Sequence, residues 1–375
     1  MFFAIVLSVW TALNAYVGWR LAGLPWIAAH LGARWTALGI VLLWLSYPVA
    51  RLLSARGLHS VAQPIEFVGA NWIGVVFLLF AALLLVDVVT AGGWLLPRLV
   101  PQLRAGAVLA GLLLGGVALF QGLRAPVVRE HEVVLPGLPR EHDGLTLVVV
   151  SDLHLGTLIG KNWLAARIAQ IDALRPDAVL IAGDLVDSDL DGALALQPVL
   201  RRLQAPRGVF CVLGNHDFYA GARRVVDFAE GAAIEVLRNR SVELAPGLRL
   251  AGIDDPAALR GGTADLRLRE ALRAAPAGAT ILLAHTPDTH TAAEAAAAGV
   301  GLMCSGHTHG GQIWPFGELV RRRYPLFAGR YEVGAMAVLV GRGAGTWGPR
   351  LRLWAPGEIL RVRLRASPAP GPDPR

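Results

Sequence analysis

Residues 148–156 have the sequence VVVSDLHLG, in which an apolar run is followed at once by polar side chains. This pattern is typical of a buried parallel strand that delivers functional groups at its carboxyl end, where ligands bind in open α/β sheets. Asp152 and His154 are two residues apart, so a locally extended chain points both side chains the same way. A carboxylate and an imidazole together suit Zn, Mn, Fe or a similar ion. Alone, the pair also fits a strand end with a helix-capping Asp.

The composition divides the chain into a membrane part and a soluble part. Hydrophobic residues make up 54% of the chain and charged residues 17%, which is too apolar for one soluble domain. Residues 1–124 carry few charges and contain apolar runs close to the ~20 residues that span a bilayer. We therefore expect an N-terminal helical membrane region with about four transmembrane helices, at residues 2–19, 35–50, 67–86 and 105–123.

The sequence does not determine the orientation in the membrane. Four crossings would place the N-terminus and the soluble part on one side, and the flanking arginines divide equally between the two sides. The net charge of +7 indicates either affinity for anionic lipids and substrates or only a base composition that favours Arg codons. Because the arginines are not interleaved with aromatic residues, we expect no nucleic-acid partner.

The rest of the chain alternates predicted strands and helices. We expect a Pro-punctuated linker at 125–144 with one strand at 132–135, a domain at 145–365, and a disordered Pro-rich tail at 366–375. The expected strands are 145–150, 178–182, 208–213, 249–252, 280–284, 301–304, 333–341, 350–354 and 358–364. The expected helices are near 162–174, 192–203, 220–231, 265–274 and 288–298.

Four later strand ends carry polar side chains like those of the first. LIAGDLVD provides Asp184 and Asp187, VLGNHD provides Asn215, His216 and Asp217, LLAHTPD provides His285, and CSGHTHGGQ provides His307 and His309. Each residue taken singly fits a cap, a turn or a satisfied strand-end histidine. If the five ends converge on one edge of the fold, however, they exceed the needs of one ion. They suit two divalent ions that share a bridging carboxylate.

The five motifs, in this order, resemble the calcineurin-like metallophosphoesterase superfamily over about residues 145–365. The apolar N-terminal part and the segment GRGAGTWGPRLRLWAPGEI at 341–359 look like its membrane-anchored bacterial branch, transmembrane proteins with a metallophosphoesterase domain. The resemblance implies an α/β fold in which a helical membrane region precedes an αββα sandwich of two sheets flanked by helices.

The same resemblance implies roles for the motif residues. One ion would be bound by Asp152, His154, Asp184 and His309. The second would be bound by Asp184, Asn215, His285 and His307, with Asp184 bridging. His216 is implied as the acid that protonates the leaving oxygen, with Asp217 orienting it, whereas we expect Asp187 to be structural. The two divalent ions could be Mn, Fe, Zn or Mg.

The sequence thus predicts a membrane-anchored binuclear-metal phosphoesterase that hydrolyses a phosphodiester or diphosphate bond with metal-activated water. Some relatives cleave UDP-2,3-diacylglucosamine in lipid A biosynthesis, which implies a phosphate-containing lipid or nucleotide-lipid as substrate and the bilayer as partner. By this analogy, a multi-pass cell-membrane protein would have its catalytic domain on the cytoplasmic side. Ser188 stands where protein Ser/Thr phosphatases have Arg, which disfavours a phosphoprotein substrate.

Other functions fit the sequence less well. A catalytically silent metal-binding or lipid-sensing module would not need His216. A transporter with an enzymatic appendage would usually show charge inside the apolar stretches of its helices, and apart from Asp87 near one end these stretches hold none. Arg321–Arg323 are expected in a solvated loop or at a lipid or diphosphate contact. Gln312 and Trp314 are expected either to line the pocket or to pack.

Overall fold

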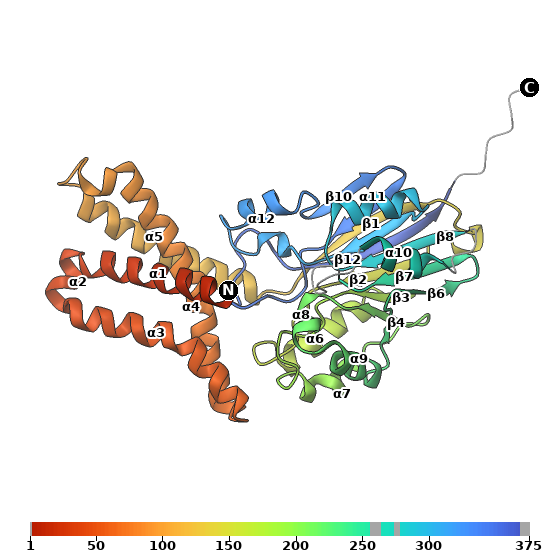
Figure 1. Cartoon of the computed structure of the whole chain (residues 1–375), viewed down its shortest axis with the longest axis horizontal. Helices are drawn as coiled ribbons and strands as arrows, with labels where there is room; N and C mark the ends of the chain where they lie inside the picture. Colours follow the sequence, from red (N-terminus) through yellow and green to blue (C-terminus); the bar gives the residue numbers. More distant parts are fainter. Residues whose placement is uncertain (1, 256–263, 274–277, 368–375) are drawn as a thin grey trace, which may run out of the picture. The chain divides into compact units, whose positions relative to one another are not determined.

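The computed structural model describes residues 2–255, 264–273 and 278–367 and divides into two units (Figure 1). A helical unit comprises Met1–Arg124 and Gly348–Trp354. An α/β unit comprises Ala125–Trp347 and Ala355–Arg375. The division falls where the composition changes, except that one short late segment belongs to the helical unit.

The helical unit has a long helix at each of the four expected places. Its helices are α1 (Phe2–Ala22), α2 (Pro25–His30), α3 (Gly32–Ala55), α4 (His59–Val89) and α5 (Val100–Leu123). Among the described residues, the helices long and apolar enough to cross a membrane are α3, α4 and α5. A crossing by α1 remains a prediction, and so does the placement of both ends of the unit on one side.

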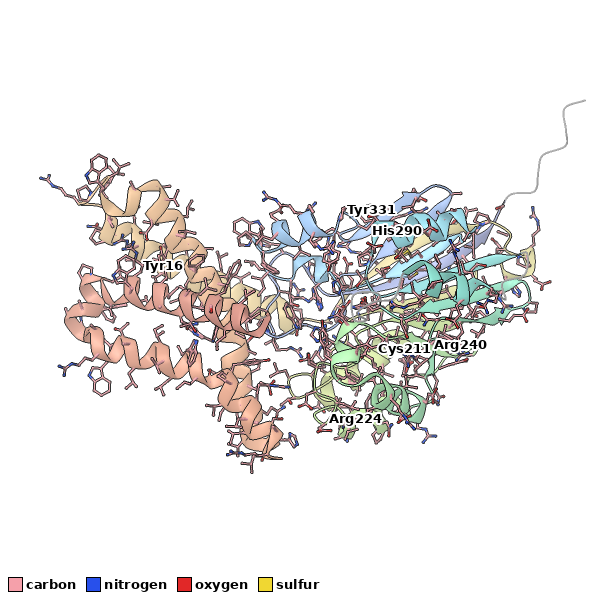
Figure 2. All side chains as sticks on the ribbon, viewed as in Figure 1. Tyr16, Cys211, Arg224, Arg240, His290 and Tyr331 are labelled. Carbon is pink, nitrogen blue, oxygen red and sulfur yellow. The ribbon has the colours of Figure 1, made fainter. Side chains whose placement is uncertain are left out.

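Helix α4 contains two acids, Asp87 near the end of the apolar stretch and Glu66 just before it. Helix α4 begins at His59, before the apolar run, and so includes Glu66, which is buried and lies 3.3 Å from Arg51 Nη1. Asp87 accepts a hydrogen bond from Tyr16 of α1 (Tyr16 is labelled in Figure 2) and pairs with Arg20 and Arg104 at 2.6 and 2.9 Å. Both buried acids thus have cationic partners, as a low-dielectric environment requires.

The strand expected at residues 350–354 is also absent, because this segment packs against helices. The backbone N–H groups of Arg350, Arg352 and Trp354 donate hydrogen bonds to Asn71 Oδ1, the Ala118 carbonyl and Gln121 Oε1, at 3.0, 2.9 and 2.9 Å. Both arginines are buried. The alternation of apolar and charged residues in LRLW, which resembles a strand, therefore belongs to a segment that contacts α4 and α5 and joins neither sheet.

The first sheet of the α/β unit has the order β1-β12-β2-β3-β4-β5. Its strands are β1 (Val127–Leu135), β2 (Thr146–Val150), β3 (Ala178–Ala182), β4 (Val209–Val212), β5 (Glu235–Val236) and β12 (Glu358–Ala366). Strands β2 to β5 are parallel, and β12 is antiparallel to β2.

Residues 125–144 are more than the expected linker. They include β1, which pairs in parallel with β12 along its whole length, so the segment closes one edge of the sheet. The expected tail at 366–375 overlaps the end of β12 at Ala366, and residues 368–375 lie outside the described part of the chain.

The second sheet has the order β10-β11-β9-β8-β7-β6. Its strands are β6 (Arg240–Ala245), β7 (Leu248–Ile253), β8 (Ala279–Ala284), β9 (Leu302–Ser305), β10 (Gly329–Val333) and β11 (Met336–Val340). The four central strands are parallel, whereas β6 and β10 pair antiparallel at the two edges.

Alternation along the strands builds the layers. Leu147 and Val149 of β2 join a core that both sheets share, while Val148 and Val150 face helices on the outer side. The helices against the first sheet are α6 (Lys161–Asp172), α7 (Gln197–Leu200) and α9 (Ala222–Gly231). Helices α10 (Ala264–Leu272) and α11 (Thr289–Ala297) cover the second sheet. The α/β unit thus consists of two mixed sheets packed face to face between helices.

Candidate metal centre

Each predicted ligand lies just after the carboxyl end of a strand. The loops after β2, β3 and β4 leave the same edge of the first sheet, because these three strands are parallel neighbours. The loops after β8 and β9 leave the second sheet in the same way. The five strand ends converge, as the distances below show.

The backbone at these loop positions is unusual. Asp152, His154 and Asp184 have φ angles of 52°, 45° and 51°, and His307 and His309 have φ angles of 69° and 52°. Non-glycine residues rarely adopt this left-handed region, and such strain is concentrated at functional sites. Gly183 has a φ of 85°, and a Cβ there would overlap the His285 ring, so the two loops can approach closely only with glycine at this position.

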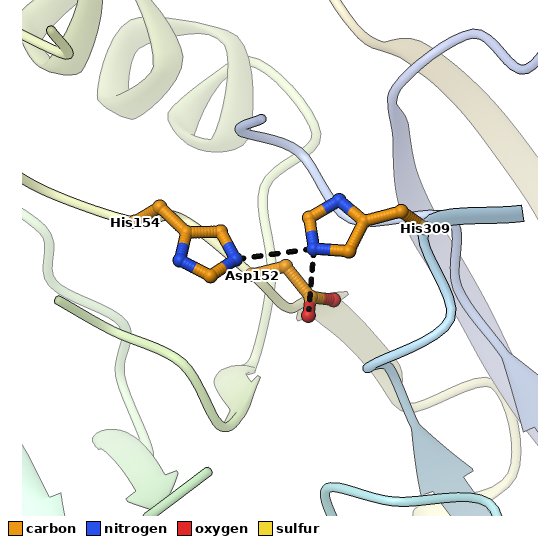
Figure 3. A group of neighbouring side chains, drawn as sticks. All are labelled: Asp152, His154 and His309. Carbon is orange, nitrogen blue, oxygen red and sulfur yellow. Dashed lines mark hydrogen bonds and ion pairs between the residues drawn. The ribbon is translucent and has the colours of Figure 1, made fainter. Parts of the chain in front are cut away.

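One group of side chains consists of Asp152, His154 and His309 (Figure 3). The Nε2 atoms of His154 and His309 lie 3.1 Å apart, and His309 Nε2 lies 3.4 Å from Asp152 Oδ1. Two ring nitrogens and a carboxylate oxygen that converge in this way fit a cation bound by all three side chains.

A second group consists of Asp184, Asn215, His285 and His307. His307 Nδ1 lies 3.0 Å from Asn215 Oδ1 and 3.3 Å from His285 Nε2. Asp184 Oδ2 lies 3.1 Å from His285 Nε2 and 3.8 Å from His154 Nε2. The Asp184 carboxylate therefore faces both groups, which is the position of a bridging ligand.

The electrostatics suit ligands for a cation. Burial lowers the pKa of both His154 and His307 to about 4, so these imidazoles are neutral and free to coordinate. Burial opposes ionisation of Asp184, but the neighbouring histidines, His285 foremost, together outweigh burial and lower the pKa of the carboxyl below its usual range. The same pairing raises the pKa of His285 against the effect of its own burial.

Further contacts orient the ligand rings. His285 Nδ1 lies 2.8 Å from the Ala182 carbonyl oxygen, which leaves Nε2 facing the centre. His307 Nε2 lies 2.9 Å from the Tyr324 hydroxyl, which leaves Nδ1 facing the centre. Such outer partners fix the tautomer and orientation of a metal-binding histidine.

Two residues beside the centre are absent from the sequence-based set. Asp255, fully buried, groups with His285 and His307, and it follows β7 as the predicted ligands follow their strands. The strand-end pattern could therefore have indicated Asp255. Tyr324 follows α12 (Gly317–Arg323), and no sequence pattern marks it.

Asp217, the residue expected to orient His216, contacts backbone groups. Asp217 accepts hydrogen bonds from the backbone N–H groups of Leu185, Val186 and Gly214 at 3.3, 3.0 and 2.9 Å, so it ties the β3 loop to the β4 loop. Burial beside Asp184 raises the pKa of Asp217 to about 7.

His216 Nδ1 instead lies 3.2 Å from Asp187 Oδ1 and 3.0 Å from Ser188 Oγ. Burial works to lower the pKa of His216, but the hydrogen bond with Asp187 and the charges of Asp184 and Asp187 together outweigh it, and the pKa is raised. Asp187, which we expected to be structural, is therefore the carboxylate in contact with the His216 ring.

The donor set fits divalent ions well. It combines carboxylates, neutral imidazoles and an amide oxygen, all delivered by strand ends, and Asp184 faces both groups. A buried cluster of this kind beside a histidine that can donate a proton defines the class as a metal-dependent hydrolase. The described side chains do not select one metal over another.

Comparison with known proteins identifies the family. Residues 145–311 match the calcineurin-like phosphoesterases. An uncharacterized metallophosphoesterase of Helicobacter pylori (strain J99) is 33% identical over 264 residues, which cover 70% of each chain. The chain belongs to the metallophosphoesterase family and hydrolyses phosphoester bonds.

Two other relatives match a similar share of this chain but different shares of their own length. The transmembrane protein with metallophosphoesterase domain of Bos taurus is 32% identical over 276 residues, 70% of this chain and 62% of its own length. An uncharacterized metallophosphoesterase of Bacillus subtilis is 32% identical over 283 residues, 71% of this chain and 94% of its own length. The likeness to a transmembrane relative agrees with the three long apolar helices and favours membrane association.

Proposed function

We propose that this phosphoesterase is anchored in a membrane and cleaves an amphiphilic phosphodiester or diphosphate at the bilayer surface. The observation that carries the proposal is the presence, in one chain, of the metal centre and of three helices apolar enough to cross a membrane. Anchoring raises the effective concentration of lipid-borne substrates and gives little advantage with soluble ones.

In this proposal the metal ligands are the seven residues expected from the motifs, namely Asp152, His154, Asp184, Asn215, His285, His307 and His309. Two divalent ions bound there would polarise phosphoryl oxygens and activate water. The chain's own acid is His216. Asp187 and Ser188 engage its Nδ1, which leaves Nε2 to donate a proton to the leaving oxygen.

The Arg321–Arg323 cluster supports an anionic substrate. These residues form the last turn of α12 and not the loop we expected, and the next residue, Tyr324, contacts the ligand His307. A headgroup phosphate or a diphosphate bound by these arginines would therefore lie close to the centre. Salt would screen the attraction.

The finer identity of the substrate rests on resemblance. UDP-2,3-diacylglucosamine, as in lipid A biosynthesis, fits the description of a lipid-linked diphosphate, and a phospholipid fits it as well. With either substrate, the analogy favours a catalytic unit on the cytoplasmic side of the cell membrane.

The test uses the full chain reconstituted in liposomes with Mn²⁺. We expect higher kcat/KM on UDP-2,3-diacylglucosamine or a bilayer phosphodiester than on the soluble bis(p-nitrophenyl) phosphate, and a smaller difference at high salt. Asp184→Asn controls for contaminating activity. A preference for soluble esters that is equal in liposomes and in detergent would contradict the membrane-substrate proposal.

A further inference from the structure

We infer that Tyr219 and Trp347 form a subsite for a leaving group that carries a ring, either a nucleoside or a sugar. The inference rests on the proposed function, because it takes His216 as the acid that protonates the leaving oxygen. It adds a class of leaving group to the membrane-surface substrate proposed above.

The two aromatic rings border the same catalytic side chain. Tyr219 is the last residue of α8 (Asn215–Tyr219), and its ring centroid lies 5.5 Å from that of His216 at an interplanar angle of 65°. The Trp347 ring lies 6.0 Å from His216 at 69°. Edge-to-face contacts of this kind leave much of each aromatic face open.

Both rings are exposed although they are large and apolar. Tyr219 is 63% exposed and Trp347 is 51% exposed. Single exposed aromatic residues are common and need no explanation. Two that contact one catalytic histidine from different segments of the chain form a surface at the reaction site.

Each ring is held by a short connection to the site. Tyr219 shares the single turn of α8 with His216. The Gln312 side chain, buried and three residues after His309, donates a hydrogen bond to the Trp347 carbonyl at 2.9 Å and accepts one from its N–H at 3.0 Å. Because this reciprocal pair fixes the Trp347 backbone beside the metal centre, little ordering remains to be done when a ligand binds.

The position of the leaving oxygen brings its substituent to these rings. His216 Nδ1 is engaged by Asp187 and Ser188, so a leaving oxygen must approach Nε2. A group bonded to that oxygen lies within reach of rings whose centroids are 5.5 and 6.0 Å from the imidazole centroid.

The chemistry of the rings favours one class of group. Tyr and Trp stack on the flat face of a nucleobase and on the apolar face of a sugar, and base stacking contributes about 1–3 kcal/mol per base. A straight alkyl group offers no such face. The subsite therefore selects ring-bearing alcohols over linear ones.

The experiment uses the full chain in detergent with Mn²⁺ and methyl phosphodiesters that differ in the second alcohol. The alcohols are uridine (through its 5′ oxygen), glucose (through its 6 oxygen), benzyl alcohol and n-butanol, and release of each is followed by chromatography. We expect Tyr219→Ala and Trp347→Ala to lower kcat/KM about tenfold for the ring-bearing esters and at most about twofold for the butyl ester. The relative losses on the uridine and glucose esters distinguish the two sources of the ring.

Controls separate a subsite from a structural role. Leu319→Ala removes a side chain that is 58% exposed on α12 and should change no ratio. Tyr219→Phe should retain the preference, and metal content should match that of the unmodified chain in every variant. Equal losses on butyl and ring-bearing esters would overturn the inference.

Binding of a leaving group to the subsite can also be measured without hydrolysis. Calorimetry with non-hydrolysable methylphosphonate esters of benzyl alcohol and n-butanol should show about tenfold tighter binding of the benzyl ester, and both alanine variants should abolish the difference. An unmodified chain that binds metal but hydrolyses no ester would contradict the proposed function. Equal binding of the two phosphonates would contradict the subsite.

Discussion

The buried carboxylates of the two units have different kinds of partner. In the helical unit, Asp87 lies between Arg20 and Arg104, and Glu66 lies beside Arg51, so permanent cations balance each acid. In the α/β unit, Asp152 and Asp184 face histidines. One of these histidines, His154, is neutral because burial lowers its pKa to about 4.

The difference shows how to distinguish a structural polar cluster from a catalytic one. A guanidinium remains protonated and satisfies a carboxylate permanently, so the helical clusters hold helices together. The neutral imidazoles of His154 and His307 add no permanent positive charge to the α/β cluster and have lone pairs free for a bound cation. Substitutions in the two clusters should therefore affect activity to very different degrees.

The largest effect on activity is expected for Asp184→Asn, which weakens both halves of the metal centre at once. Hydrolysis should fall by more than the ~10²–10⁴-fold typical of losing a general acid, and elemental analysis should show both ions depleted. Asp191→Asn is the matched control, because Asp191 pairs with Arg224 on the exposed surface (Figure 2 labels Arg224). Near-normal metal content in Asp184→Asn would exclude a bridging role.

His216→Ala should give the second-largest effect. We expect hydrolysis to fall about 10²–10⁴-fold on poor leaving groups, with bound metal retained, because a proton donor is lost while the ligands remain. The loss should shrink on p-nitrophenyl esters, whose leaving group needs no proton. His290→Ala, on the exposed surface of α11, should have no effect. Equal losses on good and poor leaving groups would indicate a positional role for His216.

Asp187→Asn should shift the pH profile and lower the rate less. Asp187 raises the pKa of His216, and an acid catalyst is active only while protonated, so activity is lost as pH rises through that pKa. Without the carboxylate the pKa falls, and the alkaline limb of kcat should move to lower pH. Asp217→Asn should leave the position of this limb unchanged, since Asp217 binds backbone N–H groups. An equal shift in both variants would contradict the Asp187 assignment.

The smallest effect on activity is expected for Asp87→Asn in the helical unit. Loss of the carboxylate leaves Arg20 and Arg104 without their charge partner, and breaking a buried ion pair costs about 3–5 kcal/mol of stability. Thermal unfolding in detergent should begin at lower temperature, while kcat per bound metal at 25 °C changes less than about twofold. A loss of kcat as large as that of Asp187→Asn would show that the two clusters are not functionally separate.

The sequence alone predicted seven ligands and the strand ends that carry them, and the structure brings these strand ends together. The prediction was possible because each motif is local: a short apolar strand, a tight turn and a polar residue at fixed spacing. Long apolar runs likewise located the long helices of the first 124 residues. A run of about 20 consecutive apolar residues can be read directly from the sequence, without knowledge of what the helix packs against.

Only the tertiary structure determined the contacts between segments that are distant in the chain. Asp217 adjoins His216 in the sequence, whereas Asp187 belongs to the preceding motif, yet the relative placement of the β3 and β4 loops brings Asp187 to the His216 ring. Residues 350–354 alternate like a strand, yet their N–H groups find partners on helices, because a backbone donor accepts any suitably placed oxygen. Spacing along a chain specifies which side chains a segment presents, and packing decides which of them meet.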